Sequence, residues 1–172
     1  GIHGVLRPGD HVVTSAAEHN SVLRPLHFLR DRNIIDLTVV PVDRDGVTDA
    51  DQMLAAVTNT TRLVTLTHAS NVTGAMQPIE SVAKGMQAKE GFLLVDAAQT
   101  FGTTAIDVAM GIDLLAAPGH KASAGPLGTG FLYVNPVIQK ELVPFVQGGT
   151  GSRSESLDMP AVMPAKLEAG NL

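Results

Sequence analysis

The sequence alternates short, unbroken apolar runs with segments of helical character, and this alternation most constrains its fold. Apolar runs without polar interruption are typical of parallel strands that are buried on both faces. Helices between such strands cover the two faces of the sheet. We therefore expect an α/β fold with a mainly parallel sheet flanked by helices. The expected strands are residues 11–15, 37–42, 62–67, 92–96, 114–117 and 130–134, and the expected helices are residues 21–32, 49–57 and 78–90.

Composition excludes several classes of function. Of 172 residues, 44% are hydrophobic and 17% charged, as expected for a folded globular chain. Aromatic content is 3% and the net charge is -5, which disfavours nucleic acid and anionic membranes as partners. No apolar stretch is long enough to span a membrane. The chain contains no cysteine, which excludes disulfides within it, and we expect a cytoplasmic protein.

The two ends of the sequence indicate an internal piece of a longer polypeptide. The chain starts without Met, and Ile2, Val5 and Leu6 have the spacing of a last helical turn. Residues 147–152 are rich in glycine, and residues 153–164 lack periodicity. We expect a large domain over residues 1–146, truncated on its N-terminal side, and a loop and connection toward a further domain over residues 147–172.

A lysine lies between the last two expected strands, in an apolar and glycine-rich setting. Lys121 ends the run Ala117–Lys121 and precedes Gly125–Gly130. Burial would disfavour its ammonium form and make the amine a better nucleophile. The glycines would let a planar ligand approach the backbone closely. This environment suits a lysine that forms a Schiff base.

Polar side chains follow several of the expected strands. Ligands of open α/β sheets bind beyond the carboxyl ends of the strands, so we expect these side chains to converge on one rim. The polar residues are Glu18 and His19, then His68, Ser70 and Asn71, then Asp96 and Gln99, then His120 and Lys121.

Four short motifs occur in a fixed order: Ala17–Ser21, His68–Gly74, Val95–Gln99 and Gly119–Lys121. Together they resemble the class V aminotransferase group of pyridoxal 5'-phosphate (PLP) enzymes, most of all its cysteine desulfurase and selenocysteine lyase branch. The resemblance implies the large domain of a PLP-dependent transferase of fold type I, similar to aspartate aminotransferase, with a sheet of the seven-stranded type that is incomplete here. It implies PLP as cofactor and an amino acid as substrate.

The resemblance also implies roles for three central residues. Lys121 would form the Schiff base and move protons at the α-carbon of the substrate. The His19 imidazole would stack on the cofactor ring. Asp96 would bind the ring nitrogen.

Four further residues would complete the cofactor site. Gln99 would donate to the phenolic oxygen of the cofactor. Asn71 would bind that oxygen or the substrate carboxylate, and His120 would contact the phosphate. Asn171 takes the place of a threonine that reaches the phosphate of a partner subunit in relatives, which implies a homodimer.

The chain departs from the family pattern at Pro118, where many relatives carry a hydroxyl residue that contacts phosphate. A desulfurase also needs a nucleophilic cysteine and passes sulfur to an acceptor protein, and this chain has no cysteine. A class V aminotransferase, which transfers an amino group to a keto acid, therefore stays open as an alternative. A non-catalytic binding module of the same fold is a second alternative. A nucleotide site is disfavoured because Gly125–Gly130 does not join a strand to a helix, and the scattered histidines disfavour a metal site.

Overall fold

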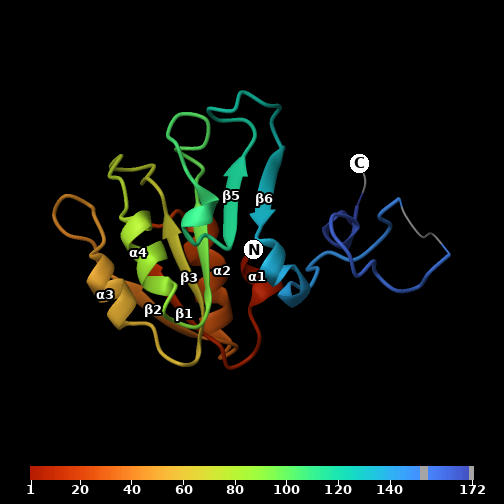
Figure 1. The fold of residues 1–172 in the computed structure, drawn as a ribbon, viewed down its shortest axis with the longest axis horizontal. Coiled ribbons are helices and arrows are strands. Elements are labelled where there is room, and N and C mark those ends of the chain that lie inside the picture. The colour runs from red at the N-terminus through yellow and green to blue at the C-terminus, as the bar shows by residue number, and fades with distance from the viewer. Residues whose placement is uncertain (152–154, 171–172) are drawn as a thin grey trace.

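A six-stranded sheet forms the centre of the computed structural model, which describes residues 1–151 and 155–170 (Figure 1). The strand order is β2-β1-β3-β4-β5-β6. β1 to β5 run parallel, and β6 is antiparallel to β5. The prediction of a mainly parallel sheet is confirmed. The described residues form six strands, whereas the expected type of sheet has seven. The strands are β1 His11–Ser15, β2 Asp36–Val40, β3 Thr61–Thr67, β4 Phe92–Asp96, β5 Leu114–Pro118 and β6 Gly130–Val134.

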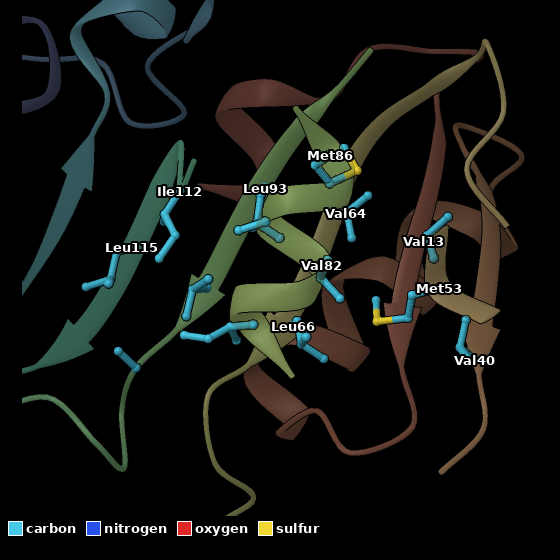
Figure 2. Close-up of a cluster of buried hydrophobic side chains, with 14 of the residues drawn as sticks. Val13, Val40, Met53, Val64, Leu66, Val82, Met86, Leu93, Ile112 and Leu115 are labelled. Carbon is cyan, nitrogen blue, oxygen red and sulfur yellow. The ribbon is translucent and has the colours of Figure 1, made fainter. Parts of the chain in front are cut away.

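Helices cover both faces of the sheet, as expected. α3 and α4 pack on one face, where Met53 from α3 and Val82 and Met86 from α4 meet strand residues such as Val64 and Leu93 (Figure 2). α1 and α2 pack on the other face through a second buried cluster. Burial on both sides explains the unbroken apolar strands. The helices are α1 Ile2–Val5, α2 Asn20–Asp31, α3 Ala50–Ala55 and α4 Ile79–Met86, and the 3-10 helices are η1 Val108–Met110, η2 Pro136–Glu141 and η3 Ala165–Leu167.

Caps decide where the helices start. Asp49 caps α3, since its carboxylate accepts the N–H groups of Asp51 and Gln52 at 2.8 and 3.1 Å. His19 caps α2, which therefore begins at Asn20, one residue before the expected start. The expected extension of α4 to about residue 90 is wrong. That helix ends at Met86, and residues 87–91 form turns before β4.

The chain returns to the α1 side of the sheet after β6. Ile138 of η2 packs into the second buried cluster, and the Val143 N–H donates to the Gly4 carbonyl at 2.8 Å. Residues 147–151 and 155–170 extend away from the body of the sheet (Figure 1). Lys166 links it back through a 2.9 Å bond to the Gln139 carbonyl. The division at residue 146 stays a prediction. No helix in residues 1–151 and 155–170 has both the length and the apolarity to span a bilayer.

Candidate active site

A cavity of about 1040 Å³ lies at the carboxyl ends of the parallel strands. Residues from the ends of β1, β3, β4 and β5, which are far apart in the sequence, come together in its wall. This convergence is what a parallel sheet predicts for polar residues that follow its strands. The predicted site residues in the wall are His19, Asn71, Asp96, Gln99, His120 and Lys121. Asn171, the remaining predicted residue, lies outside the described residues.

Asp96 ends β4, half-buried in the cavity wall. Its Oδ1 accepts the N–H of Ala98 at 2.8 Å, which fixes the plane of the carboxylate at the strand end. The main chain around it is also held, because the Asp96 carbonyl accepts the N–H of His68 at 2.8 Å. A carboxylate oriented in this way presents its second oxygen as an acceptor for a protonated ligand nitrogen.

His19 is exposed at the first turn of α2 and lines the same cavity. Its Nδ1 lies 3.1 Å from the Ser21 N–H and 2.8 Å from the Ser21 hydroxyl. Because Nδ1 accepts from the backbone, the proton of the neutral ring belongs on Nε2. His19 therefore serves as a helix cap and as a wall of the cavity at once.

Lys121 and His120 lie on the β5–β6 loop and are exposed toward the cavity. The expectation that burial activates Lys121 is wrong, since the loop leaves its side chain open to solvent. The nearby glycines also have a role within the loop itself. A Cβ at Gly119 would lie 2.3 Å from Oγ1 of Thr129, and one at Gly125 would lie 2.8 Å from the Gly119 carbonyl. These glycines let the two halves of the loop pack against each other.

The two predicted amides are exposed at the rim. Asn71 sits in the turn after β3, where the Ser70 N–H donates to the Ala75 carbonyl at 3.0 Å. The Ser70 hydroxyl accepts from the Val72 N–H at 3.2 Å and stabilises the same turn. Gln99 follows Asp96 in the turn after β4. Both side chains are thus free to donate to a ligand from firmly held turns.

Sequence reasoning gave no role to two buried groups behind the cavity. Glu18 is buried and accepts a hydrogen bond from the backbone N–H of Thr67. His68 is buried and bonded to Thr100. Both belong to the motifs Ala17–Ser21 and His68–Gly74 and were expected at the rim of the sheet, but neither lines the cavity. A polar residue just after an apolar strand was the signal available. Within the described parts of the chain, no cluster of acidic and histidine side chains suits a metal ion.

Comparisons with known proteins agree on one family. The Aminotransferase class-V family model matches residues 1–172. A probable cysteine desulfurase of Methanothermobacter thermautotrophicus is 43% identical over 96% of this chain and 42% of its own length. The cysteine desulfurase IscS of Dictyoglomus turgidum is 36% identical over 83% of this chain and 35% of its own.

Solved structures agree with the sequence relatives. The cysteine desulfurase CsdA of Escherichia coli superposes with a TM-score of 0.85 at 29% identity, over 97% of this chain and 42% of its own length. A structure described as SspA in complex with cysteine gives a TM-score of 0.77 at 37% identity, over 82% of this chain and 40% of its own.

The chain belongs to the class V aminotransferase family. Within that family, the relatives and solved structures that it resembles include several cysteine desulfurases. The chain spans about two fifths of the length of these proteins.

Proposed function

We propose that the full-length protein is a PLP-dependent enzyme that acts on amino acids and releases sulfur from cysteine, or selenium from selenocysteine. The observation that carries the proposal is the joint presence of Asp96, His19 and Lys121 in one cavity wall. The names of the relatives support the same activity. Cytoplasmic location is part of the proposal and rests on the absence of cysteine from the chain.

The cavity fits PLP in its volume and in the chemistry of its wall. A volume of about 1040 Å³ holds a cofactor together with an amino acid. The Asp96 carboxylate would keep the pyridine nitrogen protonated, and the His19 ring would cover one face of the cofactor. When bound, PLP supplies an electron sink for negative charge at the α-carbon of the substrate.

The remaining wall residues would orient the cofactor and substrate. The amides of Gln99 and Asn71 would donate to the phenolic oxygen or to the substrate carboxylate. His120 would contact the phosphate. The Lys121 amine would bond to the aldehyde carbon of PLP, and when displaced by substrate it would move a proton at the α-carbon.

The proposed enzyme is a homodimer in which Asn171 approaches the phosphate site of the partner, and it passes sulfur to an acceptor protein. Class V aminotransferase activity stays open as the alternative. Sulfur transfer needs a thiolate, and none of the 172 residues is cysteine.

The test uses the full-length protein, its Lys121→Ala variant and PLP. We expect visible absorbance that is lost on borohydride reduction, with the cofactor mass fixed on Lys121, and neither effect in the variant. Cysteine should then release sulfide, whereas amino transfer to a keto acid without sulfide would establish the alternative. Intact protein that fails to take up PLP would contradict both activities and favour a non-catalytic module.

A further inference from the structure

Glu18 occupies the point where β1 and β3 stop pairing. The registered β1–β3 pairs end at Thr14 with Thr65. β1 itself ends at Ser15, and the chain then leaves the sheet through residues 16–18. N–H groups along a strand point alternately to its two neighbours. The His68 N–H reaches the Asp96 carbonyl on the β4 side, so the Thr67 N–H points to the β1 side.

The Glu18 side chain supplies the acceptor that β1 no longer provides. Its Oε1 accepts the Thr67 N–H, and Glu18 as a whole is only 7% exposed. Without it, the buried Thr67 N–H would lack a partner, at a cost comparable to a lost hydrogen bond. Glu18 is followed at once by His19, and Thr67 pairs with Asp96 across β3 and β4. The hydrogen bond between Glu18 and Thr67, called the bridge below, thus connects the backbone next to His19 with the backbone next to Asp96. Both His19 and Asp96 line the cavity.

We propose that Glu18 is a positioning residue, which ties the end of β1 to the end of β3 and so holds His19 in place relative to Asp96. This role rests on the proposed PLP site, because His19 and Asp96 are its proposed ring contacts. Glu18 itself is absent from the cavity wall and therefore acts through its neighbours.

The surroundings of Glu18 favour its neutral form. Burial raises the pKa of Glu18 to about 8, the Thr67 N–H opposes this rise, and the negative charge of Asp96 adds to it. Its Oε2 is buried with no hydrogen-bond partner in the part of the chain that the structure describes. Because Oε1 accepts from Thr67, Oε2 is the oxygen that would carry the proton of the neutral acid. A neutral Glu18 leaves the single negative charge of the pair on Asp96, where a pyridinium would need it. The titratable groups at these strand ends are His19 after β1, His68 after β3, Asp96 on β4, and His120 and Lys121 after β5.

The test compares Glu18→Gln with Glu18→Ala in the full-length protein, with exposed Glu90 changed to the same residues as control. Glutamine keeps the acceptor and places a donor where the acid carries its proton. We expect Glu18→Ala to weaken PLP binding at least ~10-fold and Glu18→Gln to stay within about threefold of wild type, since tenfold corresponds to ~1.4 kcal/mol. Unchanged binding in Glu18→Ala, or equal losses in both variants, would overturn the proposal.

Two measurements without cofactor keep this test separate from the proposed function. Amide exchange at Thr67 should accelerate in Glu18→Ala and stay slow in Glu18→Gln. The folded pKa of Glu18 is raised, so wild type should lose stability relative to Glu18→Gln as pH rises from about 4.5 to about 8. A pH-independent difference, or fast exchange in Glu18→Gln, would refute the bridge whether or not PLP binds. If Glu18→Ala fails to fold, the test rests on Glu18→Gln and wild type alone, through amide exchange at Thr67 and the pH dependence of their stability.

Discussion

The imidazole Nδ1 of His68 and the hydroxyl Oγ1 of Thr100 lie 2.8 Å apart in a buried hydrogen bond. His68 follows β3 and stands three residues before Asn71, and Thr100 directly follows Gln99. The bond therefore connects the two turns that carry the proposed amide donors. The bond holds both turns from their buried side, where water does not compete for it.

Replacing Thr100 by Val should destabilise the protein, because it removes the hydroxyl without changing the volume and leaves His68 Nδ1 buried and unpaired. The expected loss is about 1–3 kcal/mol in the free energy of unfolding, measured by urea denaturation of the full-length protein. Thr104→Val at an exposed position is the control. A Thr100→Val variant as stable as wild type would show that the bond contributes nothing.

The free energy of unfolding should fall as the pH becomes acidic, because of His11. His11 is buried in β1, with its ring nitrogens 2.7 Å from Thr61 Oγ1 and 2.9 Å from Thr38 Oγ1 on the two flanking strands. Burial lowers the pKa of His11, and the charge of Asp36 opposes this. The unfolded chain then binds the proton first, so stability is lost as pH drops below about 6.5.

The measurement is the urea midpoint between pH 5 and pH 8. His11→Gln should be less stable at pH 8 but lose less stability than wild type on acidification. Burial also lowers the pKa of His68, which leaves part of the acid loss in place. His27→Gln, on the flank of α2, is the matched control. An acid loss of the same size in His11→Gln and wild type would contradict the assignment to His11.

The fold was predictable because unbroken apolar runs in the sequence mark the buried strands. A strand such as β4, Phe92–Asp96, is buried on both faces and needs unbroken apolar residues whatever its neighbours are. The end of α4 was less predictable. Residues 87–91 carry no strong stop signal before Gly91, and turns rather than helix connect Met86 to β4.

The sequence was enough to predict which residues meet at the site. It was not enough to predict how exposed they are or which groups they bond to. Strand ends converge by topology, so polar residues after different strands reach one cavity. The exposure of Lys121 depends on how the β5–β6 loop leaves the sheet. The apolar residues on either side of it in the sequence belong to β5 and β6 and do not bury it. The cap formed by His19 and the bridge formed by Glu18 depend on side-chain directions that spacing does not fix.

Replacing Gly119 by Ala should disturb the loop that carries Lys121. The new Cβ would lie 2.3 Å from Oγ1 of Thr129, whose hydroxyl bonds to the Pro126 carbonyl at 2.6 Å. We expect a loss of about 1–3 kcal/mol in stability from this overpacking, together with slower attachment of PLP to Lys121. Thr129→Ala in the same chain should recover part of the loss. Gly148→Ala, with no atom within 4 Å of its Cβ, is the control, and equal effects of the two alanines would contradict the steric account.

Replacing Pro118 by Ser should tighten PLP binding. Pro118 ends β5 in the cavity wall. Its ring offers no donor at the position where the family resemblance implies a hydroxyl against the phosphate. A serine hydroxyl there would add one hydrogen bond to a charged group, worth about 1.5–3 kcal/mol, or roughly tenfold or more in affinity.

The measurement is the dissociation constant of PLP, with Pro118→Ala separating the hydroxyl from the loss of the ring. Serine should bind PLP more tightly than alanine, and added inorganic phosphate should compete more strongly in the serine variant. Pro118 pairs with Gly130 at the end of the β5–β6 ladder, so thermal unfolding of both variants reports any change in the strand itself. Equal affinities of the serine and alanine variants would show that the phosphate lies away from residue 118.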